Sequence, residues 1–458
     1  MTETAPAGRA RDTQADPPGW VIRAGQLVQR PDRRAVPDGA VVVRHSTITW
    51  AGPAGQLPAE DRRLPVEDHP ASTIMPGLIE THAHLGSYTP HVSQHVSDPA
   101  LLAQSLHILS ALATARQLAS VGVTTVQSLG ARHYADVALR EAIAAGVLAG
   151  PRILASGAQL TTTGGHSWTN GAEVDSIDDI RRTVRRHHKA GVDVIKVMAT
   201  GGFMTPGTGP WAAQFSAEEL RALVQEAHRL GKRTAAHAHG TEGIRRAVDA
   251  GIDYLAHASF VDPDGVTRFD GALADAIAER GIFVDTCAPP SWPPVPGETF
   301  TPRAKQLYEH GVGLVAGHDI GAVLPPSGYT FGLKQLEASG IPRAEVLTAA
   351  TTRAAAALGL SEVTGELVAG RSADLIVVDG DPLESLDALD ALSRVVIGGR
   401  PFVPDQVVPF DPKGSIPGQG PDTPGRVQAS RNARWTAHRG LRHGPAFRAR
   451  MHTPEETP

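Results

Sequence analysis

The chain has 458 residues, a formal net charge of −5 and a single cysteine, Cys287. Its length exceeds one ordinary compact domain and suits a barrel with an accessory domain. The charge balance leaves no basic stripe for nucleic acid, one cysteine excludes an internal disulfide, and no stretch is apolar enough to span a membrane. We therefore expect a cytoplasmic protein with no nucleic-acid partner and no membrane partner.

The first strand-like runs follow an N-terminal segment, 1–19, that is rich in Thr, Ala, Pro, Asp and Arg and is expected to be disordered. Short β-like runs occupy 20–23, 39–44 and 46–52, and Pro37-Asp-Gly39 marks a turn before the second run. These features predict a small antiparallel sheet.

From Thr73 onward, strand-like runs alternate with helix-like segments. Helices are expected at 101–119 and 135–148, and after Ser216-Ala-Glu-Glu, where apolar residues recur at helical spacing. The alternation indicates an α/β chain with a (β/α)8 barrel over 76–361. An open doubly wound sheet is the alternative, but no Gly-rich dinucleotide loop follows a strand. The eight predicted strands are 78–85, 124–129, 152–156, 192–199, 233–239, 254–259, 282–287 and 313–320.

After the barrel, a further helix is expected at 343–358, and β-like runs return at 373–379 and 394–398. We expect these runs to pair with the N-terminal ones, so that 20–75 and 362–405 form one composite β-sandwich. Residues 406–458 are rich in Pro, Gly and Arg and predict an irregular extension. Binding of this extension to an acidic partner or a neighbouring subunit is a minor hypothesis.

Residue types that bind metals recur at the predicted strand ends, where a barrel places its chemistry. His82 and His84 point to the same side of a strand. His237, His257 and Asp319 end three later strands. Each residue alone has an ordinary structural explanation, but together they predict a metal site.

Lys196 lies in an apolar run, where a buried unpaired ammonium would be costly. A lysine that reaches solvent or pairs with a carboxylate is the simpler interpretation. A lysine carbamate formed with CO2, which could bridge two cations, is the alternative.

Several motifs resemble those of the metal-dependent amidohydrolase superfamily, in particular its imidazolonepropionase-like and prolidase-like (Xaa-Pro dipeptidase-like) members. The similarity runs from about residue 20 to 403. The matching segments include Pro76-Gly-Leu-Ile-Glu-Thr-His-Ala-His84, Thr163-Gly-Gly-His166, Ile195-Lys-Val-Met-Ala-Thr-Gly-Gly202, His237-Ala-His-Gly240 and Gly365-Glu-Leu-Val-Ala-Gly-Arg-Ser-Ala-Asp374.

This resemblance implies a distorted barrel, a composite β-sandwich and a site for two divalent metal ions. One ion would be bound by His82, His84 and Asp319, the other by His237 and His257, and a carboxylated Lys196 would bridge them. Zinc suits such N and O ligands, with Mn2+, Co2+ or Fe2+ as alternatives. His239 is expected to contact substrate or to support the ligands.

The implied reaction is hydrolysis of an amide C–N bond in a small molecule such as a dipeptide or an N-acyl amino acid. A hydroxide that bridges the two metals would attack the carbonyl, with Asp319 as general base and acid. Three alternatives stay open: a mononuclear imidazolonepropionase- or deaminase-like hydrolase of cyclic C–N bonds, an ester or phosphotriester hydrolase, and a catalytically inactive barrel that acts as a binding protein. A homo-oligomer is compatible with every one of them.

Substrate contacts are expected from loops after the predicted strands. The candidates are Tyr88, His166, Trp168, His239 and Tyr329. The chain departs from the family pattern beside the ligands, where Asp is usual at Glu80, Thr at His318, Glu at Ala256 and His at Ser327. These departures bear on the identity of the substrate.

Overall fold

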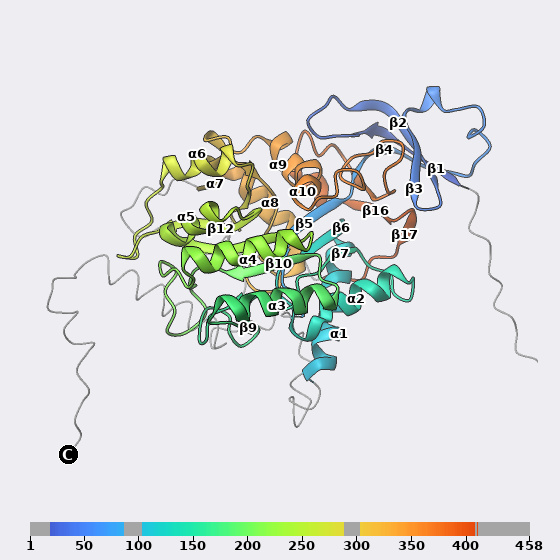
Figure 1. Ribbon diagram of the computed structural model, residues 1–458. Coiled ribbons are helices and arrows are strands. Elements are labelled where there is room, and N and C mark those ends of the chain that lie inside the picture. The colour runs from blue at the N-terminus through green and yellow to red at the C-terminus, as the bar shows by residue number, and fades with distance from the viewer. Residues whose placement is uncertain (1–18, 87–102, 288–302, 408–409, 411–458) are drawn as a thin grey trace, which may run out of the picture.

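The computed structural model describes residues 19–86, 103–287, 303–407 and 410 (Figure 1). The predicted disordered segment 1–19, except for Gly19, and most of the extension 406–458 lie outside these residues. The described chain forms an all-β region at one end and a larger region of parallel strands and helices.

The β region is built from both ends of the chain, as expected. Its seven strands are hydrogen-bonded in the order β17-β16-β15-β4-β1-β2-β3, and β15 pairs antiparallel with β4. Alternate residues of β2 enter two separate apolar clusters, with Val41 and Val43 in one and Val42 in the other. The strands are β1 (Trp20–Leu27), β2 (Val36–Arg44), β3 (Thr47–Pro53), β4 (Val66–Pro76), β15 (Leu375–Asp379), β16 (Leu392–Ile397) and β17 (Arg400–Phe402).

The parallel strands form two sheets, β5-β6-β7 and β14-β13-β12-β11-β10-β8-β9. Backbone contacts join the two sheets, because Ala83 bridges Ile320 in parallel and Asp193 N–H donates to Ala155. The strands are β5 (Leu78–Ala83), β6 (Val123–Ser128), β7 (Arg152–Leu154), β8 (Leu160–Thr161), β9 (Ala172–Glu173), β10 (Val194–Met198), β11 (Arg233–Gly240), β12 (Tyr254–Val261), β13 (Phe283–Asp285) and β14 (Gly313–Leu314).

Helices cover the parallel strands (Figure 1). The predicted capping box is present at α4, where Ser216 and Glu219 cap each other's backbone amides. The helices are α1 (Ala103–Ser120), α2 (Ala135–Ala144), α3 (Ile177–Ala190), α4 (Ala217–Arg229), α5 (Thr241–Ala250), α6 (Gly271–Glu279), α7 (Arg303–Glu309), α8 (Tyr329–Ala338), α9 (Arg343–Ala349) and α10 (Thr352–Ala357).

The single helix predicted at 343–358 is wrong, since α9 and α10 are separate. The barrel strands use the carbonyl groups at the break: Ala316 N–H donates to Ala349 and Ile79 N–H donates to Ala350. The carbonyl groups of Ala349 and Ala350 therefore accept hydrogen bonds from these residues and are not available for the hydrogen bonds that would continue α9.

The eighth predicted strand, 313–320, is also much shorter than expected. Only β14 is regular, because the next residues change hydrogen-bond partners. Val315 N–H donates to Val284, whereas Ile320 N–H donates to His82. This irregular backbone turns the side chain of Asp319 toward the end of β5.

The two regions are joined at the Pro76-Gly77 step. Gly77 N–H donates to Asp374 of the β region, and a Cβ at position 77 would lie 2.2 Å from Thr124. Glycine is therefore needed where β4 passes into β5.

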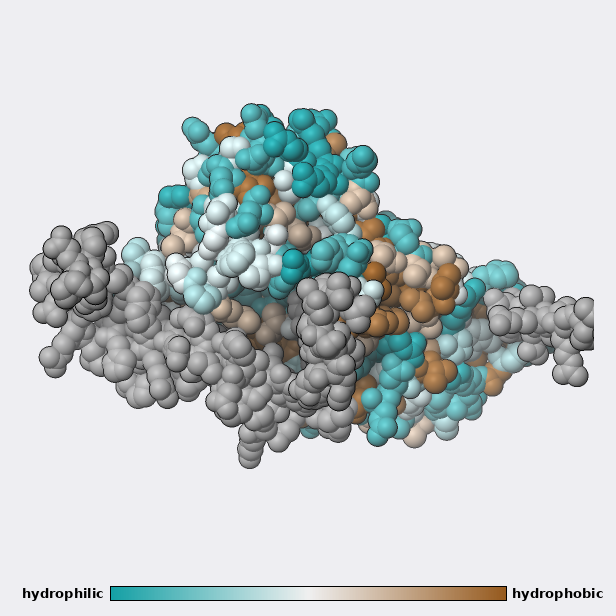
Figure 2. All heavy atoms as spheres, turned by 90° about the horizontal axis from the view of Figure 1, so that it is seen from below, coloured by the Kyte–Doolittle hydropathy of each residue, from teal (hydrophilic) through white to brown (hydrophobic). Residues whose placement is uncertain are grey.

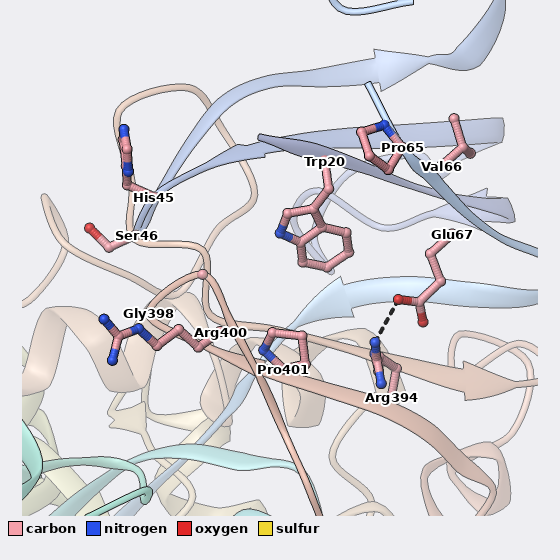
Figure 3. Close-up of a pocket in the computed structure, with 11 residues that line it drawn as sticks. Trp20, His45, Ser46, Pro65, Val66, Glu67, Arg394, Gly398, Arg400 and Pro401 are labelled. Carbon is pink, nitrogen blue, oxygen red and sulfur yellow. Dashed lines mark hydrogen bonds and ion pairs between the residues drawn. The ribbon is translucent and has the colours of Figure 1, made fainter. Parts of the chain in front are cut away.

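A pocket lies in the β region (Figure 3). Trp20, Pro65 and Pro401 form part of its wall. Its Glu67 carboxylate lies 2.7 Å from the guanidinium of Arg394 and is therefore neutralised. This pocket offers no cluster of metal ligands.

The surface is mixed in character. Figure 2 shows brown hydrophobic side chains gathered beside hydrophilic ones on the face seen from below. The exposed apolar residues of the described chain include Leu109, Val147 and Val403. No helix among the described residues combines the length and apolar character needed to cross a membrane.

Candidate metal centre

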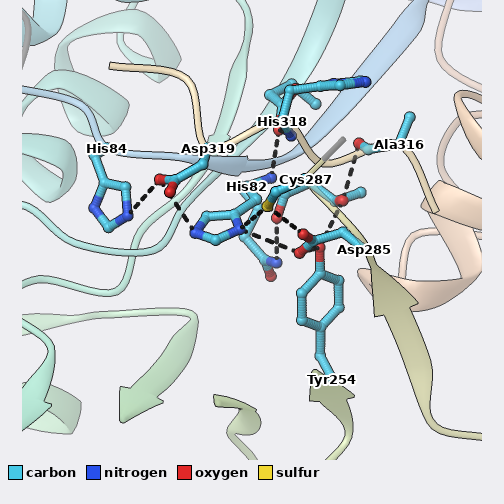
Figure 4. A network of polar contacts seen from close by, with 11 residues as sticks. His82, His84, Tyr254, Asp285, Cys287, Ala316, His318 and Asp319 are labelled. Carbon is cyan, nitrogen blue, oxygen red and sulfur yellow. Dashed lines mark hydrogen bonds and ion pairs between the residues drawn. The ribbon is translucent and has the colours of Figure 1, made fainter. Parts of the chain in front are cut away.

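The first group of metal-type ligands comes from the end of β5 and the segment after β14. His82, His84 and Asp319 are buried, and one ligand atom from each lies within 4.8 Å of the others (Figure 4). His84 Nε2 lies 3.1 Å and His82 Nε2 lies 3.6 Å from Asp319 Oδ1. The structure thus brings together the three residues predicted to bind one metal ion.

The His82 ring is oriented by a buried carboxylate that we did not single out from the sequence. Asp285 Oδ2 lies 3.1 Å from His82 Nδ1 and accepts a 2.6 Å hydrogen bond from the Tyr254 hydroxyl. Nε2 of His82 is left facing Asp319. A carboxylate behind a ligating histidine fixes the tautomer and raises the basicity of the ring.

Glu80 and His318, two of the departures from the family pattern, contact each other. Glu80 Oε2 lies 2.9 Å from His318 Nδ1, and both groups are buried. Glu80 Oε1 accepts the backbone N–H groups of His82 and His318. Burial raises the pKa of Glu80, whereas His318 opposes this change.

The second group of ligands comes from β11 and β12. His237, His239 and His257 are buried, with one nitrogen of each within 4.8 Å of the others. The rings of His239 and His257 stack at 4.3 Å between centroids, and His239 Nδ1 lies 2.8 Å from Ser259 Oγ. His239, which we expected outside the ligand set, is thus as close to the other two histidines as they are to each other.

Burial and neighbouring histidines lower the pKa of His237 and of His257 well below the ordinary value. Burial also lowers the pKa of His84. Neutral rings keep a nitrogen lone pair, which is the form that binds a metal. The two groups are adjacent, since the His82 and His257 ring centroids are 5.3 Å apart.

Lys196 on β10 lies between flanking apolar residues, and its side chain is buried. Its Nζ is shielded from solvent and has no hydrogen-bond partner. Burial lowers the pKa of Lys196, although Asp285 and Asp319 oppose this effect. Its charge in turn lowers the pKa values of His84 and His257, which places it within electrostatic reach of both ligand groups.

These residues fit divalent metal ions. The neutral imidazoles supply nitrogen ligands. Burial raises the pKa of Asp319, but His82, His84 and Lys196 lower it by more, so the pKa lies below the ordinary value and Asp319 supplies a carboxylate ligand. An unpartnered buried amine is unstable as an ammonium group, and its neutral form is the one that reacts with CO2. The conversion of Lys196 to a carbamate would supply further oxygen ligands.

The backbone is unusual at the same places. His257, Cys287 and Asp319 have positive φ angles of 74°, 42° and 54°. Non-glycine residues rarely adopt this conformation, and such residues cluster at functional sites. These backbone conformations therefore orient the three side chains toward the interior of the barrel.

Among the expected substrate residues, His166 lies beside the second ligand group. Its ring centroid is 4.6 Å from that of His237, and its buried Nδ1 has no hydrogen-bond partner. Burial lowers the pKa of His166 to about 4. Trp168 follows in the same loop and is 45% exposed.

Tyr329 differs from the expectation of a loop residue. It begins α8 and is fully buried, and its hydroxyl donates a 2.8 Å hydrogen bond to the Ile79 carbonyl. The hydroxyl group of Tyr329 is thus already hydrogen-bonded inside the barrel wall. Tyr88 lies outside the described residues.

Cys287 lies beside the first ligand group. Its Sγ is 3.2 Å from His82 Nδ1 and donates to Asp285. Burial raises the pKa of this thiol well above its usual value, and Asp285 adds to the effect. A protonated thiol here donates to the carboxylate that orients His82.

Asp285 was missed because a single acidic residue in the short run at 282–287 carries no spacing pattern. Its signal was a carboxylate that directly follows the apolar run Ile282-Phe-Val284, two positions before Cys287. Tyr254, its hydrogen-bond partner, begins β12 and had no signal of its own.

Comparison with known proteins assigns the chain to a family. The Amidohydrolase family profile matches residues 73–408. Ochratoxinase of Aspergillus niger is 28% identical over 422 residues, which covers 83% of this chain and 86% of that protein. Imidazolonepropionase of Salinispora tropica is 25% identical, over 80% of this chain and 89% of that protein.

Solved structures agree with this assignment. A Xaa-Pro dipeptidase with bound methionine in its active site superposes with a TM-score of 0.74 and 26% identity, over 84% of this chain and 99% of that one. A structure described as a putative prolidase from Bifidobacterium longum has a TM-score of 0.71 and 28% identity, over 85% and 96%. The expected barrel with a β-sandwich is thereby confirmed, and the chain belongs to the amidohydrolase family, as a hydrolase that acts on carbon–nitrogen bonds.

Proposed function

We propose that the chain hydrolyses the amide bond between an acyl group and an amino acid, in a dipeptide or an N-acyl amino acid. The proposed centre contains two divalent metal ions, with zinc as the first candidate, and a carbamate on Lys196. His82, His84 and Asp319 would hold one ion, and His237 and His257 the other.

The buried amine of Lys196 is the observation that carries the two-metal proposal. It has no hydrogen-bond partner and lies within electrostatic reach of both ligand groups. A mononuclear hydrolase of cyclic C–N bonds gives no reason for a buried lysine at this place. A carbamate provides such a reason, because it would convert a buried amine, whose protonation is costly, into an anion that two cations could stabilise.

When bound, the metal ions acidify a water molecule and polarise the scissile carbonyl. Asp319 is a carboxylate at neutral pH, because its pKa lies below the ordinary value in spite of burial, with His82 and His84 as the neighbours that lower it. It can therefore accept the proton of the attacking water and deliver it to the leaving nitrogen. Water adds to the carbonyl carbon, the C–N bond breaks, and a carboxylic acid and an amine result.

His166 is suited to bind the carbonyl oxygen of the substrate. Its pKa of about 4 leaves the ring neutral at pH 7, and its Nδ1 is buried without a partner. A neutral imidazole in the appropriate tautomer donates one N–H, which would stabilise developing negative charge on that oxygen.

The relatives support an amino-acid amide as substrate. One solved relative is a Xaa-Pro dipeptidase that holds methionine in its active site, and a sequence relative is an ochratoxinase. A dipeptidase product is an amino acid, and methionine in that active site agrees with a subsite for one.

Metal content per chain tests the centre. Elemental analysis of the wild type is expected to give two ions per chain, whereas Lys196→Ala should bind fewer. Lys189→Ala is the control, because Lys189 is exposed on α3. One ion in both the wild type and Lys196→Ala would overturn the bridged centre and favour the cyclic C–N hydrolase.

Substrate class needs a separate assay. Dipeptides and N-acyl amino acids should be hydrolysed, with release of a free amino acid measured by amine derivatisation. Activity on esters or cyclic amides alone would contradict the proposal.

A further inference from the structure

Arg303 is a partly buried cation that pairs with no carboxylate among the residues that the structure describes. Its Nε is shielded from solvent and makes no hydrogen bond, and none of the ion pairs among the described residues includes it. Arg152 and Arg394 also have a shielded Nε, but each forms an ion pair through another nitrogen, with Asp374 and Glu67 respectively. Arg303 therefore differs from these otherwise similar arginines.

Only Nε is shielded in this way, so the two Nη groups of Arg303 are the part of the guanidinium group that can bind a further partner. Burial lowers the pKa of Arg303 to about 10, so the side chain still carries its charge at neutral pH. A buried charge is stabilised by an opposite charge or by hydrogen bonds. Phe260 gives only a partial substitute, with its ring centroid 5.8 Å from Arg303 Cζ.

The position of Arg303 connects it to the metal centre. It begins α7, which follows β13 in the chain, and its partner Phe260 lies on β12, three residues after His257. Ser259, next to Phe260, contacts His239 Nδ1 at 2.8 Å.

We propose that Arg303 binds the free carboxylate of the amino acid on the leaving side of the scissile bond, and so selects substrates that end in a carboxylate. A guanidinium fork matches the two oxygens of a carboxylate. The inference rests on the proposed amide hydrolysis, but its test is a binding experiment that does not depend on turnover.

The experiment is calorimetric titration of the metal-loaded full chain with L-methionine and with L-methioninamide, which replaces the carboxylate by a neutral amide. The wild type should bind the acid about 10- to 100-fold more tightly than the amide, as expected for one charge-assisted contact. In Arg303→Met this preference should disappear, and in Arg303→Lys it should be intermediate. Lys305→Met is the matched control, because Lys305 is an exposed cation on the same helix.

Equal affinity of the wild type for the two probes, or absence of binding, would overturn the inference. An unchanged preference in Arg303→Met would also do so, because it would assign the carboxylate to the metal ions. If Arg303→Met fails to fold, Arg303→Gln replaces it, and circular dichroism and metal content establish that each variant is intact. Loss of the preference without any amide hydrolysis would leave Arg303 as a carboxylate site and refute only the proposed reaction.

Discussion

Glu80 and His318 form a buried pair that joins the two strand ends carrying the first ligand group. Glu80 Oε2 lies 2.9 Å from His318 Nδ1, and Oε1 accepts the N–H groups of both His318 and His82. One carboxylate thus fixes the backbone at His82 and immediately before Asp319. The two departures from the family pattern are coupled, since each side chain is the hydrogen-bond partner of the other.

Glu80→Ala is expected to lower the free energy of unfolding by about 3–5 kcal/mol, because it leaves the buried His318 ring and two N–H groups without their acceptor. Urea denaturation of the metal-free protein measures this. Glu141→Ala is the control; its carboxylate is 66% exposed and pairs with Arg140 on the surface, so its loss should change stability by about 1 kcal/mol or less. Similar losses in both variants would contradict a structural role for the Glu80–His318 pair.

Asp285→Asn should weaken metal binding about 10- to 100-fold while leaving the fold intact, because an amide no longer favours the tautomer that presents Nε2 of His82. The dissociation constant can be measured by competition with a coloured chelator.

Asp275→Asn provides the comparison for Asp285→Asn. Asp275 also contacts a histidine, His310, at 2.6 Å, but its side chain is 58% exposed. Equal metal affinity in Asp285→Asn and the wild type would show that the carboxylate behind His82 does not tune the centre.

Lys196→Met should stabilise the metal-free protein at pH 7. Burial lowers the folded-state pKa of Lys196 below its ordinary value of 10.5. Between the two pKa values the unfolded chain binds the additional proton, so wild-type stability rises with pH in this window. Each unit of the pKa difference corresponds to about 1.4 kcal/mol. The advantage of the variant should therefore be greatest near neutral pH and shrink as pH approaches 10.5.

Urea denaturation from pH 7 to pH 10, with a chelator and in CO2-depleted buffer, measures this difference. The exposed Lys189→Met should show no pH-dependent difference from wild type. A Lys196→Met protein that is less stable than wild type at pH 7 would show that the amine is well solvated or paired.

The alternation of strands and helices was predictable because it depends on local periodicity. So was the gathering of the metal-type residues, since they recur at strand ends and a barrel places those ends together. The break between α9 and α10 was not predictable, because it arises when Ile79 and Ala316, far away in the chain, bind carbonyls of the expected helix.

The contacts that support the ligands could not be predicted for the same reason. Asp285 contacts His82, and Glu80 contacts His318, across long separations in the sequence. A single charged residue in an apolar run indicates that something must neutralise it, but not what.

Tyr329 and His166 were both expected to bind substrate, and the structure separates them. Tyr329→Phe removes the hydrogen bond to the buried Ile79 carbonyl and should cost about 1–3 kcal/mol of unfolding free energy, with KM unchanged. His166→Asn should have the opposite profile, with stability near that of wild type and a lower kcat/KM, because its Nδ1 has no partner to lose. Both variants are assayed with one dipeptide and one urea titration each. A raised KM in Tyr329→Phe with unchanged stability would return Tyr329 to the substrate site, and unchanged kinetics in His166→Asn would remove His166 from it.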